Sequence, residues 1–236
     1  MARRGGGGAR LLVVLAMLAA LVAAAVLAGN TVGRSYAEKR VAETVQAQAG
    51  LPTPPTVSIK DPMFVWSVIR QHVDRVDVAA DRVPMQVAGK QVEVRVVGTL
   101  TDVRPSGSSF VAGGLTADAT LEWGQIEKLT GYPLVKGPGN TVVATVATTI
   151  LGQRVNAAVT ARPLIDAQGR FTVTEPKATV NGVAVPEQLT GAIVTAVMKP
   201  IDLGLPVGLR ATRVEAADGG LVLSLEGRDV DLAQLR

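Results

Sequence analysis

Residues 91–100 read QVEVRVVGTL, and this stretch decides the fold because apolar and polar side chains alternate along it. Val92, Val94 and Val96 fall on one side of an extended chain, and polar residues stand between them. A period of two is typical of a strand with one face in the core and the other in solvent. The stretch therefore predicts a half-buried strand, of the kind that antiparallel sheets use.

Similar β-prone runs recur along the chain and predict a sheet of several strands. Gly152-Gln153 separates two long runs, and Asn181-Gly182 is a strong two-residue hairpin signal. Residues 105–114, which are mostly small, are predicted to form a loop. The predicted strands cover residues 56–60, 73–80, 91–100, 115–122, 141–151, 154–164, 171–174, 209–216 and 221–226.

Short helices are predicted between these strands. Ser35 and Glu38 have the spacing of a capping box, which places a helix over residues 35–49. Asp61-Pro62 is typical of a helix start. The other predicted helices cover residues 63–71, 123–129 and 186–198. Because strands outnumber helices, the sequence predicts an α+β fold built on an antiparallel sheet with a few short apolar helices.

The N-terminus has a different character, because every residue from Leu11 to Ala28 is apolar and Arg3, Arg4 and Arg10 precede this run. A basic start, an apolar run and small residues at its end are typical of a secretory segment. The run of about 18 residues is also long enough for a membrane-spanning helix. Two alternatives remain open: a hydrophobic helix kept as an anchor, and a signal peptide cleaved after Ala28. Both predict that the rest of the chain lies on the extracytoplasmic side of the cytoplasmic membrane, in the cell envelope, anchored or secreted.

The composition divides the chain into three parts and excludes several classes of function. Residues 1–29 are the signal peptide or anchor, 30–55 a stalk helix with a Pro-rich connector, and 56–236 one α+β domain. The chain has 24 basic and 20 acidic residues, and its excess charge belongs largely to the N-terminal arginines, so no nucleic-acid-binding face is predicted. With no Cys, it forms no disulfide and no thiolate site.

The residue types that carry catalysis or bind cofactors are scarce. His72 is the one histidine, which excludes a two-His metal site, and no nucleophile elbow, P-loop or dinucleotide-binding glycine pattern occurs. We therefore expect no cofactor, no metal and no enzymatic activity. A glycan- or lipid-modifying hydrolase stays an alternative, and it requires two carboxylates that converge in a cleft.

The positive signal is apolar. In residues 63–69 every residue except Ser67 is apolar, so a helix here would be apolar nearly all round. Such a helix is buried on all sides, inserted in a membrane or exposed to an apolar ligand. An elongated groove for acyl chains would explain this pattern, and plain core packing is the alternative.

Four motifs in order resemble the LmeA-like family of actinobacterial phospholipid-binding envelope proteins. They are LPTPPTVSIKDPMFVWSVI at 51–69, VGTLTDVR at 97–104, TADATLEWGQIEKL at 116–129 and LGLPVGLRATRVEAADGGLVLSLEGRDVDL at 203–232. The resemblance implies a non-enzymatic phospholipid-binding protein that supports lipomannan-type glycolipid maturation or lipid transport. It also implies an elongated, curved antiparallel sheet with lipid held between sheet and helices, the lipid-carrier (TULIP-like) architecture.

On this reading, apolar residues of the predicted helices hold the acyl chains, and basic residues beside those helices bind the head group. The predicted acyl-chain contacts are Phe64, Trp66, Ile69, Trp123, Ile126, Leu189, Ile193 and Val197. The predicted head-group residues are Arg70, Arg75 and Lys128. The expected partners are phospholipid, the cytoplasmic membrane and envelope glycolipid enzymes. The alternative is an envelope scaffold that docks a membrane enzyme through an apolar surface, which would be exposed instead of enclosed.

Overall fold

The computed structural model describes most of the chain after residue 50 and divides it into two compact units. The described residues are 51–60, 70–87, 89–106, 109–150, 153–186 and 208–231, with isolated positions at 38, 39, 42, 43, 46, 203 and 205. Unit 1 comprises residues 1–119, 204–210 and 224–236. Unit 2 comprises residues 120–203 and 211–223.

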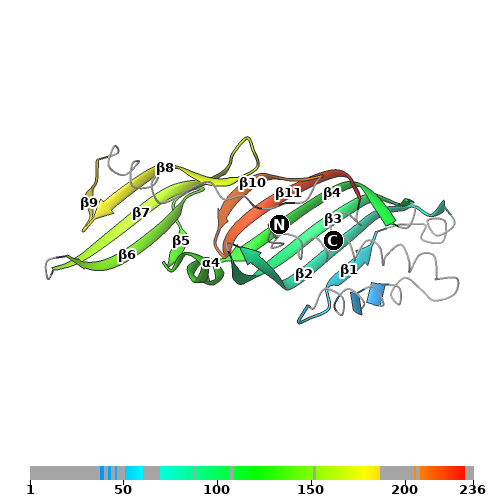
Figure 1. Ribbon diagram of the computed structural model, residues 1–236, viewed down its shortest axis with the longest axis horizontal. Helices are drawn as coiled ribbons and strands as arrows, with labels where there is room; N and C mark the ends of the chain where they lie inside the picture. Colours follow the sequence, from blue (N-terminus) through cyan, green and yellow to red (C-terminus); the bar gives the residue numbers. More distant parts are fainter. Residues whose placement is uncertain are drawn as a thin grey trace, which may run out of the picture. The chain divides into compact units, whose positions relative to one another are not determined.

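The larger sheet has six strands in the order β1-β2-β3-β4-β11-β10 (Figure 1), and unit 1 contains β1 to β3, most of β4, the start of β10 and β11 from Ser224 onward. Its strands are β1 (Thr56–Ile59), β2 (Val73–Val87), β3 (Lys90–Ser106), β4 (Ser109–Glu122), β10 (Leu209–Ala217) and β11 (Gly220–Asp231). Strands β1 to β4 are neighbours in both sequence and space. Short connections at 88–89 and 107–108 join β2 to β3 and β3 to β4, whereas a longer segment, residues 60–72, joins β1 to β2. The two C-terminal strands then extend the sheet beside β4.

The register of this sheet keeps the apolar residues of neighbouring strands on one face. β2 and β3 are antiparallel, with Val78 opposite Gly98 and Val76 opposite Leu100. The register shifts between Ala80 and Val83, where Arg82 adopts a left-handed φ of 54°. Such a bulge adds a residue to one strand and increases its twist.

Unit 2 contains a second antiparallel sheet, with the order β5-β6-β7-β8-β9, and a short helix (Figure 1). The strands are β5 (Leu134–Lys136), β6 (Val142–Ile150), β7 (Gln153–Ile165), β8 (Phe171–Val180) and β9 (Val183–Ala184). The helix α4 (Trp123–Thr130) buries Ile126 and ends at Gly131, whose φ of 80° is the left-handed conformation that favours glycine.

Most predicted strands are confirmed, and one predicted loop is wrong. The helix at 123–129 and the hairpins at 152–153 and 181–182 form as expected. Residues 105–106 and 109–114, however, belong to β3 and β4. The glycines at 113 and 114 do not break β4, because they lie where side chains of β3 come close to its backbone.

The predicted N-terminal segment and three of the predicted helices fall mostly outside the described residues. The predicted helix at 35–49 is helical at its five described positions, and Glu38 Oε1 accepts a hydrogen bond of 2.9 Å from the Ile59 backbone N–H. Residues 1–29 and most of the helices predicted at 63–71 and 186–198 are not described. Within the described residues, no helix is both long and apolar enough to span a membrane.

Candidate functional site

One face of the six-stranded sheet in unit 1 is built from aliphatic side chains, and we call it the aliphatic face. On β3 its valines alternate with exposed residues, and Val92, Val94 and Val96 are at most 2% exposed. The neighbouring strands continue the same pattern. The buried members of the face are Val57, Ile59, Val73, Val76, Val78, Ala80, Val83, Val92, Val94, Val96, Leu100, Val103, Ala112, Leu115, Ala117, Ala119, Leu209, Leu225 and Val230.

The side chains of this face are buried in the structure, and no hydrogen-bonding side chain is buried among them. Every buried residue in the described part of the chain is aliphatic, glycine or proline. Branched side chains on a pleated sheet are stiff, so they form a surface with few rotamers to lose on contact. Chemically, such a surface can exclude water from hydrocarbon and can bind or transform no polar group.

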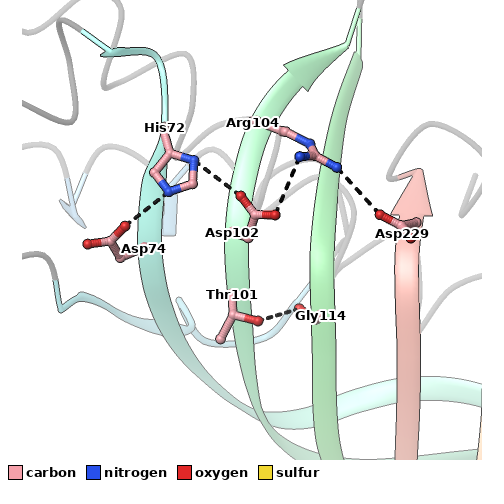
Figure 2. A network of polar contacts seen from close by, with 7 residues as sticks. All are labelled: His72, Asp74, Thr101, Asp102, Arg104, Gly114 and Asp229. Carbon is pink, nitrogen blue, oxygen red and sulfur yellow. Dashed lines mark hydrogen bonds and ion pairs between the residues drawn. The ribbon is translucent and has the colours of Figure 1, made fainter.

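A network of polar side chains lies beside the buried Val73, Val103 and Val230 in sequence, at the start of β2 and on β3 and β11 (Figure 2). His72 Nε2 lies 3.0 Å from Asp74 Oδ1, and its Nδ1 lies 3.2 Å from Asp102 Oδ1. Arg104 continues the network, with its Nη atoms 3.5 Å from both Asp102 and Asp229. Asp102 and Asp229 adopt left-handed φ values of 52° and 46°, a conformation that Asp tolerates better than most residues.

This network does not have the arrangement of a catalytic or metal site. Both ring nitrogens of His72 face carboxylates, so neither is directed at a hydroxyl group as the base of a catalytic triad would be. No group of three potential ligands in the described residues could hold a metal ion. The side chains are substantially exposed, so these ion pairs each contribute little to stability.

A second cluster of polar side chains, Arg75, Asp77 and Thr99, lies on the exposed face of the sheet, opposite the aliphatic face. Arg75 Nε donates a 2.8 Å hydrogen bond to Asp77 Oδ1, and the Thr99 hydroxyl donates another of 2.8 Å to the same oxygen. The hydrogen bond from Arg75 is the largest cause that holds the pKa of Asp77 below its ordinary value. The predicted head-group residue Arg75 thus has an intramolecular partner.

Three predicted site residues lie on α4 in unit 2. Ile126 is buried, with an exposed fraction of 4%. Trp123 is half-buried and donates a 3.0 Å hydrogen bond from Nε1 to the Asp218 carbonyl oxygen. Lys128 is exposed in the last turn, where its charge suits the negative end of the helix dipole.

The other predicted residues are divided between unit 1 and the undescribed part. Arg70 and Arg75 are exposed residues of unit 1, so the structure assigns them to a different unit from α4. Six predicted acyl-chain contacts lie outside the described residues: Phe64, Trp66, Ile69, Leu189, Ile193 and Val197. The predicted site therefore stays a prediction.

The predicted site omitted the strands that form the aliphatic face. Alternation on β3 identified Val92, Val94 and Val96 as buried, but nothing in the sequence joined them to Val76 and Val78 of β2 in one surface. The available signal was the lack of aromatic and polar residues at the inward positions of successive strands. Such a surface is built from strands that pair in space and has no compact motif.

The model of the LmeA-like phospholipid-binding family matches residues 28–226, which is most of the chain. The chain belongs to this family. The match extends over most of both compact units and includes β1 to β4, β10 and the part of β11 up to Glu226. Searches of curated proteins and of solved structures found no significant match. The family description names phospholipid binding, and an aliphatic face on an open antiparallel sheet is a surface suited to the hydrocarbon part of such a ligand.

Proposed function

We propose that this LmeA-like protein binds phospholipid with the acyl chains against the aliphatic face of unit 1. It does so outside the cytoplasmic membrane, without catalysing a reaction, and supports envelope glycolipid maturation or lipid transport. The observation that carries the proposal is the composition of the face, whose buried members are all Val, Leu, Ile or Ala. The apolar N-terminal run supports the location, because it is typical of exported or anchored chains.

The energetics favour acyl chains over other ligands. Burial of each methylene contributes about 0.8 kcal/mol, so ten methylenes contribute on the order of 8 kcal/mol before the costs of association. The buried members of the aliphatic face carry no polar group that would have to be desolvated, and this face has none that could recognise a sugar or a peptide. We therefore expect the aliphatic face to bind the hydrocarbon chains and polar residues elsewhere to select the head group.

Photo-crosslinking tests this proposal on the full chain. The protein is incubated with vesicles that contain a phosphatidylethanolamine with a diazirine near the end of one acyl chain, irradiated and digested for mass spectrometry. We expect crosslinks within β2, β3 and β4 at members of the aliphatic face, such as Val94 and Ala117. Crosslinks confined to unit 2, or none at all, would contradict the proposal.

Two neighbouring residues provide a matched pair of variants. Val96 is 2% exposed on the aliphatic face, whereas Val97 is 51% exposed on the other face of the same strand. Val96→Phe occupies space beside the acyl chain and should lower crosslinking several-fold. Val97→Phe adds the same group on the opposite face of the sheet, away from the acyl chains, and should leave acyl crosslinking unchanged. Circular dichroism on both variants checks that the sheet is intact.

The scaffold alternative also has an observation in its favour. Unit 2 exposes five large apolar side chains, with Val183 71% exposed and the others between 38% and 53%. They are Tyr132, Val135, Leu164, Val180 and Val183. A membrane enzyme bound by these residues would be recovered with the full chain and lost with Val183→Lys, while crosslinking to lipid would stay unchanged.

A further inference from the structure

The face opposite the aliphatic face is hollowed, and the hollow lies entirely within unit 1. Its volume is about 770 Å³, which is within the range of small-molecule sites. β3 lines it with Thr99 and Thr101 but not with Leu100 between them, which places the hollow on the exposed side of the sheet. Leu115 and Leu209, which are buried members of the aliphatic face, also border it. Four adjacent strands contribute to it, which gives it a rigid floor.

A smaller hollow of about 210 Å³ adjoins the first. The two share Thr99, Thr116 and Glu226, so they form one groove along β3, β4 and β11. Asp118 and Ser224 line the far part, joined by a 2.7 Å hydrogen bond from the Ser224 hydroxyl. We call the two hollows together the polar groove.

Small residues and hydroxyl groups form the floor of the polar groove. Gly113 and Gly114 have no side chain to fill it, and the Thr101 hydroxyl lies over β4 in the space that a Cβ at Gly114 would take. The Thr101 hydroxyl is 3.4 Å from the Gly114 carbonyl oxygen, a weak hydrogen bond (Figure 2). The Thr101 hydroxyl therefore gives up little binding energy when it forms a hydrogen bond to a ligand in place of the Gly114 carbonyl oxygen. The Thr116 hydroxyl has no hydrogen-bond partner among the described residues.

Arginines dominate the charge at one end of the groove. Arg228 is exposed and forms no ion pair with any other residue that the structure describes. Arg210 is 71% exposed and has a single long contact of 3.4 Å to Glu226. The larger hollow has two guanidinium groups and one carboxylate, an excess of one positive charge, whereas Asp118 lines the smaller hollow. A guanidinium presents several N–H donors in the fixed fork that suits phosphate oxygens.

We propose that the polar groove is a binding site for a phosphorylated sugar. The phosphate is held by Arg228 and Arg210, and the sugar hydroxyls are held by Thr101, Thr116 and the open backbone at Gly114. The sheet separates this site from the aliphatic face, so its ligand is a different group from the acyl chains bound there. The sugar phosphate is either a soluble molecule or the head group of a membrane lipid.

Isothermal titration calorimetry on the full chain in phosphatidylcholine nanodiscs tests the assignment. The probes are glucose 6-phosphate, glucose and inorganic phosphate. We expect glucose 6-phosphate to bind at least about tenfold more tightly than either fragment, because it engages both the arginines and the threonines. No measurable binding of glucose 6-phosphate, or equal affinity for it and inorganic phosphate, would overturn the proposal.

Variants on the exposed face identify the site. Arg228→Gln removes the phosphate partner and should weaken glucose 6-phosphate binding about tenfold or more, and Thr116→Val should weaken it less. The control is Arg95→Gln, which removes the same charge from an exposed position on β3 outside the groove, where Arg95 pairs with Asp81. Equal weakening by Arg95→Gln would show a diffuse charge effect and would overturn the site.

A second series distinguishes the two sources of the ligand. Nanodiscs that contain phosphatidylinositol should compete with glucose 6-phosphate if the groove takes a lipid head group, and should leave its affinity unchanged if it takes a soluble sugar phosphate. Either result supports a ligand in the polar groove, and the difference between them shows whether that ligand is a lipid head group or a soluble sugar phosphate. Acyl crosslinking measured on Arg228→Gln separates this inference from the proposed function, because that variant should keep wild-type crosslinking to the aliphatic face.

Discussion

Gly113 and Gly114 are neighbours on β4, yet an added methyl group would meet different surroundings at each. At Gly113 a Cβ would lie 2.9 Å from Asp102 Cβ and 2.5 Å from Asp102 Oδ2. At Gly114 it would meet only the Thr101 hydroxyl at close range, and a hydroxyl can rotate away. We therefore expect Gly113→Ala to destabilise the protein by about 1–3 kcal/mol and Gly114→Ala by less. Urea unfolding of the two variants measures the difference, and equal losses would contradict this account of β4.

A second residue-scale prediction concerns Asp77. The hydrogen bond from Arg75 lowers the pKa of Asp77, so its ionised form stabilises the folded state above about pH 4. This stabilisation is lost as the pH falls through the lowered pKa. Arg75→Gln should raise the pKa of Asp77 and make stability fall less steeply as the pH is lowered below about 4. Carboxyl NMR titration measures the pKa of Asp77 in both proteins. Asp166 is the control, because the backbone N–H of Arg170 is the largest cause that lowers the pKa of Asp166, and Arg75→Gln should leave that pKa unchanged.

At the scale of elements, Asn140 satisfies part of the exposed edge of β10. Its Nδ2 donates to the Val214 carbonyl oxygen at 3.2 Å, and its Oδ1 accepts from the Ala216 N–H at 2.7 Å. The side chain thus imitates a neighbouring strand along an edge that has no other partner in the sheet order. Asn140→Ala should cost about 1–2 kcal/mol and speed amide exchange at Ala216. Asn140→Asp keeps the acceptor, so Ala216 should stay more protected than in Asn140→Ala.

Local signals predicted the strands well where the turn chemistry was explicit. Asn181 and Gly182 both adopt positive φ, as the two-residue turn between β8 and β9 requires. The prediction of a loop at 105–114 is wrong because a run of small residues is typical of loops as well as of closely packed strands. There the glycines serve close packing between strands, and only the partner strand reveals that role. Sequence alone cannot distinguish the two uses of glycine.

At the scale of the whole molecule, the candidate site was harder to predict than the fold. Helix residues such as Ile126 were chosen because compact apolar clusters are visible in one stretch of sequence. The aliphatic face instead takes its side chains from six different strands, and members such as Val57 and Val230 are far apart in the chain. Their assembly depends on the order β1-β2-β3-β4-β11-β10, in which the last two strands join from the C-terminus.

The division into two units makes a prediction about how lipid affects the molecule. A ligand that binds only the folded state stabilises the part that contacts it, by an amount that grows with its concentration. If acyl chains lie on the aliphatic face, phospholipid should slow amide exchange in β2 and β3 of unit 1 and leave β6–β8 of unit 2 unchanged. Hydrogen-exchange mass spectrometry of the full chain, delipidated and then reloaded, measures both units in one experiment. Protection confined to unit 2 would favour docking of an apolar partner there, whereas protection confined to unit 1 would show that the lipid-binding surface is the sheet and that unit 2 has a separate task.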